Sequence, residues 1–267
     1  MSALAAATEP LSQLPVAALL SDAIDFILHE QQSIDGTPIG GPAQLWELTV
    51  VHLALSAVGL GVAALFSIPL GLWLGHRRTG ELVAIAASNV GRAVPSLALI
   101  ALFVAFVGTG FVNVALALVL LAIPPVLTGT YVGVAAVDPE IVDAARGQGL
   151  TERQIVRQIE LPLALPSIFG GLRTSAVNVV ATATIAPLAG VLTLGDPIIA
   201  TSVYGDAGRL GASILVALLA LLTELGFAQA QRAATPAGLR PTKRPRWRGS
   251  PAPPILEPHS TTHTTDL

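Results

Sequence analysis

The histidines, the serines and the single lysine of this 267-residue chain are the residues that could do chemistry, and their spacing does not favour an enzyme. No glycine-rich loop precedes Lys243, so a Walker A phosphate cradle is excluded. The five histidines lack HExxH spacing, no serine lies in a nucleophile-elbow pattern, and cysteine is absent. An intramembrane protease built on Ser213, Asp196 or Asp206 stays an open but disfavoured alternative. We expect no catalytic activity, no metal site and no cofactor.

Charged residues are scarce in the chain as a whole. They make up 12% of the sequence, about half of the roughly 25% that is usual for soluble domains, while 52% of the residues are hydrophobic. This composition excludes an ordinary soluble domain. The net charge of −3 gives no sign of nucleic-acid binding, so the lipid bilayer is the expected environment.

Charge-free stretches of the sequence match the thickness of a bilayer, which a helix crosses with about 20 apolar residues. The 28 residues from Leu48 to Gly75 carry no charge and are followed directly by basic residues. The 45 uncharged residues from Ala93 to Val137 are too many for one span, and the Gly108-Thr109-Gly110 stretch favours a turn within them. Charge spacing predicts five spans, at about 48–75, 82–107, 111–132, 166–191 and 210–227. The predicted fold is therefore an all-α polytopic membrane protein with about five transmembrane helices.

The distribution of basic residues predicts the orientation, because arginine and lysine in short loops stay on the cytoplasmic side. We place the end of the first span, at Arg77 and Arg78, in the cytoplasm. The segments then expected outside, 1–47 and 192–209, hold one basic and eight acidic residues, whereas the segments expected inside hold eleven basic residues. The N-terminus is expected outside and the C-terminus inside.

Three regions are expected along the chain. Residues 1–45 form an extracytoplasmic segment without arginine or lysine, and an amphipathic helix is predicted at 16–28, lying on the outer interface or packed on the spans. Residues 46–231 form the transmembrane domain. Residues 232–267 are rich in proline and threonine and are expected to be a disordered cytoplasmic tail.

The loop expected between the third and fourth spans, residues 138–162, contains the most specific pattern. Asp138 is a good N-cap followed by Pro139 at the first helical position, and a first helix is expected to end near Gly149. Thr151 is expected to cap a second helix, which stops before Pro162. Two alanines should leave one face of the first helix bare, so that another protein can approach closely.

This loop resembles the cytoplasmic signature of ABC-importer permeases, in which EAA is followed by three residues, glycine, nine residues and Ile-x-Leu-Pro. The matching positions are Asp143, Ala144, Ala145, Gly149, Ile159, Leu161 and Pro162. Asp143 stands where glutamate is usual, which keeps the carboxylate but shortens its reach. The resemblance implies that the loop is a coupling helix that docks on a separate ATP-binding subunit. It predicts that Ala145→Glu or Gly149→Asp leaves membrane insertion intact but abolishes ATP-dependent uptake.

Three further stretches, at 89–99, 129–139 and 178–186, are similar to permeases of the glycine betaine, carnitine and choline importers. The resemblance covers roughly residues 45–231. It implies a permease subunit that imports small quaternary amines, works as a pair with a second copy or a paralogue, and receives its substrate from an extracytoplasmic binding protein. The expected location is the bacterial cytoplasmic membrane. Alternatives are an ABC permease for amino acids such as methionine, or an ion-coupled secondary transporter.

Polar residues within the spans are candidates for the transport path, because they are costly in lipid. The candidates are Asn89, Arg92, Ser96, Asn178 and Thr182. Hydrogen bonds between spans explain the asparagines and threonines equally well, and Arg92 could instead extend to the lipid headgroups. Arg173 is expected to reach the headgroups or the 138–162 loop, and Glu224 to pair with a basic neighbour.

Overall fold

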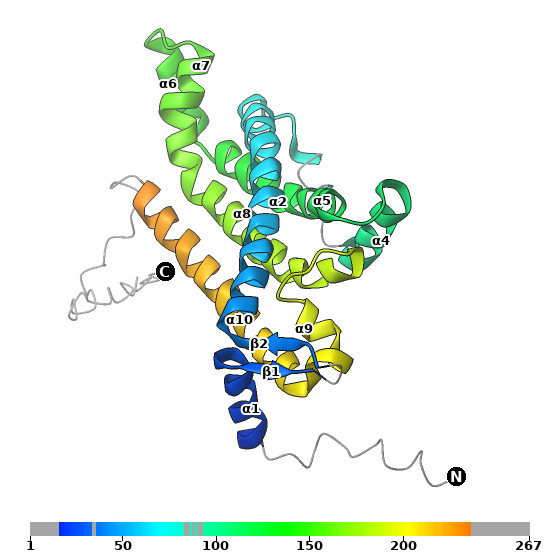
Figure 1. Ribbon diagram of the computed structural model, residues 1–267. Helices are drawn as coiled ribbons and strands as arrows, with labels where there is room; N and C mark the ends of the chain where they lie inside the picture. Colours follow the sequence, from blue (N-terminus) through cyan, green and yellow to red (C-terminus); the bar gives the residue numbers. More distant parts are fainter. Residues whose placement is uncertain (1–15, 34–35, 83–85, 87–88, 90–92, 236–267) are drawn as a thin grey trace, which may run out of the picture.

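The computed structural model describes residues 16–33, 36–82, 86, 89 and 93–235, and almost all of the described elements are helices (Figure 1). The elements are α1 (Val16–Leu28), β1 (Glu30–Gln32), β2 (Pro38–Gly40), α2 (Gly41–Arg77), α4 (Ser96–Val107), α5 (Phe111–Ala135), α6 (Pro139–Gly147), α7 (Glu152–Ile155), the π-helix η1 (Val156–Glu160), α8 (Leu161–Thr182), the 3₁₀ helix η2 (Ala183–Ala189), α9 (Asp196–Ile199) and α10 (Thr201–Ala234).

Four helices of the described chain are long and apolar enough to cross a membrane. They are Gly41–Arg77, Phe111–Ala135, the continuous helical path Glu152–Ala189, and Thr201–Ala234. They correspond to four of the five expected spans. The remaining one, at 82–107, lies partly outside the described residues, and its described part, α4, has 12 residues, which is fewer than one crossing needs.

Glycines let α2 and α5 approach each other closely along their length. Gly59 of α2 lies against Leu118 of α5. Two turns from the end of α2, a Cβ atom at Gly71 would stand only 2.7 Å from the Cβ atom of Thr130. Residue numbers rise together along these contacts, so α2 and α5 run parallel.

Small residues also bring α5 and α8 together, here in antiparallel orientation. Gly129 lies against Gly171, where an added Cβ atom would be 2.9 Å from the Cα atom of Gly171. The Ser167 hydroxyl donates a hydrogen bond to the Gly129 carbonyl at 2.8 Å, and the Ser175 hydroxyl donates one to the Ala122 carbonyl at 2.9 Å. Close backbone approach combined with such hydrogen bonds is how helices associate inside a bilayer.

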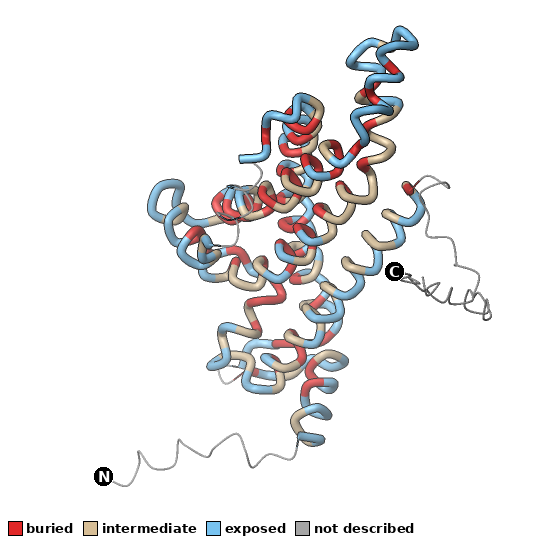
Figure 2. The backbone as a smooth tube through the Cα atoms, turned by 180° about the vertical axis from the view of Figure 1, so that it is seen from behind, coloured by how far each residue is buried: buried red, intermediate tan, exposed pale blue. Residues whose placement is uncertain are grey.

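Helix α10 is the most peripheral of the four long helices. Only 11% of its most apolar stretch is buried, compared with 50% for α5. Figure 2 shows buried residues gathered where α2, α5 and α8 meet, whereas most of α10 is exposed or intermediate. Its exposed leucines, such as Leu218, Leu221 and Leu222, would be unfavourable in water and fit a lipid-facing surface.

The N-terminal region packs on the start of α10 and forms what we call the N-terminal cap, namely α1, β1 and β2. Helix α1 has the predicted bounds, whereas the short antiparallel hairpin β1–β2 was not predicted. Phe26 of α1 is fully buried, with its ring edge-on to Tyr204 at a centroid distance of 6.2 Å. The Tyr204 hydroxyl in turn donates to a carboxylate oxygen of Asp196 at 2.8 Å. Helix α1 was expected either to lie on the outer interface or to pack on the spans, and in the structure it packs on the spans.

The cap and the 138–162 loop lie at opposite ends of the helical bundle (Figure 1). We call these ends the cap end and the loop end. The tail expected at 232–267 falls outside the described residues from 236 onward, and α10 itself continues to Ala234.

The contact between α2 and α5 predicts a specific loss of stability. Gly71→Val should lower the free energy of unfolding by about 1–3 kcal/mol, because a larger side chain has no room beside Thr130. Gly61→Val on the same helix is the matched control, since nothing lies within 4 Å of a Cβ atom there. Thermal unfolding in detergent, followed by tryptophan fluorescence, measures both. Equal midpoints for the two variants would rule out the close contact.

Candidate functional site

The 138–162 loop projects beyond the ends of the long helices, with α6 and α7 at its tip (Figure 1). An apolar cluster formed by Val142 and Ala145 of α6 and Ile155 of α7 holds the two arms together. Ile155 is fully buried even though the loop stands apart from the bundle. The loop is thus a small folded hairpin of two helices with a core of its own.

Local sequence explains where the helices of this hairpin begin. The Asp138 carboxylate accepts a hydrogen bond from the Glu140 amide at 2.9 Å, as an N-cap does. At the second helix the Gln154 side chain accepts one from the Thr151 amide at 2.8 Å, forming a capping box. Between them Gly149 has a φ angle of 87°, which is the left-handed region that favours glycine.

The alanines expected to form a bare face point in different directions. Ala144 is exposed, as is Asp143, whereas Ala145 is 5% exposed and belongs to the core of the hairpin. The expectation that both alanines face a partner is therefore wrong for Ala145. Consecutive helical residues are about 100° apart around the helix, so Ala145 is turned into the core of the hairpin while Ala144 stays outside. Ala145→Glu would disturb the hairpin itself and is not a clean test of docking.

The second helix of the loop does not stop before Pro162, contrary to expectation. Instead α7 continues through η1 directly into α8, and Pro162 lies in the first turn of α8. The π-helical turn η1 comes just before this proline, which cannot donate the backbone hydrogen bond of an uninterrupted α-helix. Leu161 is half-buried against the spans, and Ile159 packs on the hairpin core.

A network of charged side chains ties the loop together. Arg146 of α6 contacts Asp143 at 2.9 Å and Glu152 of α7 through two hydrogen bonds of 2.9 and 3.1 Å. These bonds, above all those from Glu152, raise the pKa of Arg146 above its usual value. Asp143 therefore has a partner within its own helix.

Histidine 76, at the end of α2, extends this network beyond the loop. Its Nε2 atom lies 3.0 Å from a carboxylate oxygen of Glu152, and its Nδ1 atom lies 2.8 Å from one of Glu160. The Glu160 side chain is only 4% exposed. In the sequence, His76 stands beside Arg77 and Arg78 at the basic end of the first predicted span. No local signal could have paired it with Glu160, because the two residues are 84 positions apart.

A polar groove of about 510 Å³ lies between α5 and α8. Its polar lining comes from Thr128, Arg173, Thr174 and Asn178, and its floor contains the closely packed glycines of the two helices. The Arg173 guanidinium lies 3.2 Å from a Glu224 carboxylate oxygen on α10. Glu224 therefore pairs with a basic neighbour as predicted, but Arg173 reaches α10 and not the loop.

The candidate path residues are dispersed over several parts of the structure. Asn178 lines the α5–α8 groove, and Thr182 lies one turn further along α8 and is half-buried. Asn89 is exposed, and Ser96 is half-buried at the start of α4. Arg92 lies outside the described residues.

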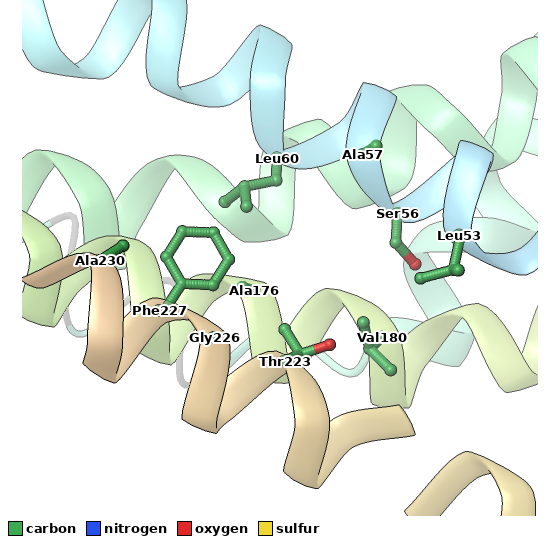
Figure 3. Close-up of a pocket in the computed structure, with 10 residues that line it drawn as sticks. All are labelled: Leu53, Ser56, Ala57, Leu60, Ala176, Val180, Thr223, Gly226, Phe227 and Ala230. Carbon is green, nitrogen blue, oxygen red and sulfur yellow. The ribbon is translucent and has the colours of Figure 1, made fainter. Parts of the chain in front are cut away.

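A second cavity, of about 370 Å³, lies between α2, α8 and α10 (Figure 3). Leucines 53 and 60 of α2 face Val180 of α8 and Phe227 of α10 across it. Its lining is almost entirely apolar, with the hydroxyls of Ser56 and Thr223 as the exceptions. We call it the α10 crevice. It offers no group that could replace the hydration of a charged solute, so the α5–α8 groove is the better candidate for a solute path.

The bundle of long apolar helices and the folded, charged loop between α5 and α8 define a permease subunit of the ABC-importer class. Residues 67–234 match the sequence profile of the family described as binding-protein-dependent transport system inner membrane component, and the chain belongs to this family. The match extends from the last third of α2 to the end of α10 and includes the loop.

Relatives of known name agree with this assignment. The choline transport system permease protein OpuBB of Bacillus subtilis (strain 168) is 34% identical over 196 residues, which are 73% of this chain and 90% of that protein. The glycine betaine/carnitine/choline transport system permease protein OpuCB of the same organism is 32% identical, covering 72% and 89% of the two chains. In fold, a chain of the MetNI methionine ABC transporter in an inward-facing conformation is similar with a TM-score of 0.63 at 22% identity, covering 72% of this chain and 96% of that one.

The family defines what this chain does and what it leaves to other subunits. It is a non-catalytic component of the inner membrane in an ATP-driven transporter, and ATP hydrolysis takes place in a separate ATPase. A substrate-binding protein is the other partner that the family implies.

The different burial of the two alanines gives a prediction for the hairpin. Ala145→Glu should open it, because an unpaired carboxylate inside an apolar cluster costs several kcal/mol, whereas Ala144→Glu should leave it closed. Hydrogen exchange of the amides at 139–155 checks this. We expect protection to fall by at least about tenfold in the first variant only. Similar exchange in both variants would show that Ala145 does not support the hairpin.

Proposed function

We propose that this chain is the permease subunit of an ATP-driven importer of small quaternary amines, with glycine betaine, choline and carnitine as the substrate class. The observation that carries the proposal is the similarity to osmoprotectant permeases, at 32–34% identity over more than two thirds of the chain. Similarity to the methionine transporter is limited to the fold, at 22% identity. An amino-acid permease is therefore the weaker alternative.

The 138–162 loop is proposed as the site that docks on the ATPase. Asp143 and Ala144 are exposed on α6, and the small alanine leaves room for a partner. The remaining residues of the signature support the shape of the loop. Ala145 and Ile159 pack in or against its core, Gly149 allows its turn, and Leu161 and Pro162 begin α8. The loop end would then face the cytoplasm, and the cap end would face the binding protein.

Two permease chains, identical or paralogous, are proposed to form the pore together. A groove that is open along one side cannot enclose a solute, and the α5–α8 groove needs a second surface to become a channel. Its hydroxyls and the amide of Asn178 could replace part of the hydration of a small polar solute. Thr182 would continue this polar line one turn further along α8, while Asn89, Arg92 and Ser96 remain proposed contributors from another part of the chain.

The substrate class is tested with the complete complex in proteoliposomes, containing this chain with its ATPase and binding protein. We expect ATP-dependent uptake of labelled choline or glycine betaine, with no competition from excess methionine. Uptake of methionine alone would favour the amino-acid alternative. Uptake that needs an ion gradient but no ATP would favour a secondary transporter.

Docking of the loop is tested by Ala144→Glu in the same vesicles. A carboxylate placed at the centre of a protein interface, without a partner, should lower ATP-dependent uptake by at least about tenfold. Ala144→Ser is the matched control, since serine is nearly as small and should keep uptake near that of the parent. Normal uptake by the glutamate variant, in complexes of normal composition, would exclude this face of α6 from the docking site.

A further inference from the structure

The end of α2 contacts both arms of the 138–162 loop. On one arm, the Arg78 guanidinium donates a hydrogen bond of 2.6 Å to the Val137 carbonyl, directly before α6. On the other arm, His76 lies between Glu152 and Glu160. Arg78 has a φ angle of 51°, the left-handed conformation that a side chain other than glycine rarely adopts. The chain thus turns sharply after α2.

Both ring nitrogens of His76 lie 2.8–3.0 Å from a carboxylate oxygen, and we call this pair of contacts the His76 bridge. The contact with Glu160 is buried and the contact with Glu152 is open to solvent: the Glu160 side chain is 4% exposed and the Glu152 side chain is 57% exposed. Glu152 also holds Arg146, so charged contacts run without interruption from α2 through α7 to α6.

Covalent continuity alone does not connect α2 to the loop. Helix α5 ends at Ala135 immediately before the loop, and α8 follows η1 without a break, so any displacement of the loop pulls directly on these two helices. Helix α2 belongs to a different part of the chain. It packs closely on α5 as far as Gly75, which lies against Val134, and its contacts to the loop itself run through His76 and Arg78.

We propose that His76 is a positioning residue for energy coupling, because its contact with Glu152 makes the end of α2 move together with the loop when the ATPase displaces it. The inference rests on the proposed docking of the loop. Without the bridge, a moving loop would pull directly on α5 and α8 and would act on α2 only through its packing on α5. The three helices would then not change conformation as one unit.

The two contacts of His76 can be removed separately. The side-chain amide of asparagine takes the place of Nδ1, so His76→Asn keeps a donor toward Glu160 and loses the contact to Glu152. Glutamine places its amide near Nε2, so His76→Gln does the reverse. Glu152→Ala removes the same contact as His76→Asn from the exposed side, and also the two bonds from Arg146, so the double variant shows whether His76→Asn acts through Glu152.

Two measurements are made on the complete complex. The first is substrate imported per ATP hydrolysed. The second is the distance between spin labels at Thr79→Cys, beyond α2, and Arg153→Cys, on α7, with and without trapped ATP. The chain has no cysteine of its own, so these labels are specific. The matched control is His29→Gln, which removes an exposed histidine–carboxylate pair at the cap end, between His29 and Asp25 at 2.8 Å.

We expect His76→Asn and Glu152→Ala to lower import per ATP by about tenfold, with no further loss in the double variant, and to broaden the label distance when ATP is trapped. His76→Gln should keep both values near the parent while lowering the unfolding temperature, because Glu160 loses its partner. His29→Gln should change neither value.

Unchanged import and distances in His76→Asn and Glu152→Ala would overturn the proposal. Equal losses in His76→Asn and His76→Gln, in step with lower stability, would assign His76 a purely structural role. The label distances do not depend on the substrate, so a parent complex that fails to import quaternary amines would refute the proposed substrate and leave this test intact.

Discussion

The close approach of α2, α5 and α8 is the constraint on which the rest of the structure depends. In a bilayer, lipid tails are as apolar as leucine side chains, so burying leucine gives little reason for helices to associate. Here the helices associate through close packing at small residues. These are Gly59 and Gly71 between α2 and α5, and Gly129 and Gly171 between α5 and α8. This packing fixes the position of the loop, because the loop connects α5 to α8 and contacts the end of α2.

The outer helix meets this unit in a different way. Helix α10 is joined to α8 by the pair Arg173–Glu224 and by a hydrogen bond of 2.8 Å from the Gln231 side chain to the Pro166 carbonyl. Between these ties and α2 lies the apolar α10 crevice, and on the other side of α8 lies the polar α5–α8 groove. The two sides of α8 thus offer opposite chemistry, one matched to lipid and the other to a hydrated solute.

Local features of this fold could be predicted, and features that depend on distant contacts could not. The cost of placing charge in lipid acts on each stretch of sequence by itself, so charge spacing predicted the four helices that are long and apolar enough to cross a membrane, and the caps at Asp138 and Thr151 are equally local. Which alanine of α6 faces outward depends on where α7 packs, and the sequence does not contain that information in any local pattern. His76 meets Glu160 only because the end of α2 lies beside η1, at the base of the loop. The π turn of η1, which leads into Pro162 without a break, likewise depends on the packing of α8.

The N-terminal cap has a consequence for how the molecule is made. Ser33 donates a hydrogen bond to the Val203 carbonyl, 170 residues later, and Phe26 is buried against Tyr204 of the same late segment. A ribosome releases the first of these partners long before the second, so α1 can pack on α2 early but lacks its partners on α10 until the last long helix has entered the bilayer. Closure of the cap is then a late step of biogenesis, and it joins a segment that precedes the region matched by the family to a helix at the end of that region.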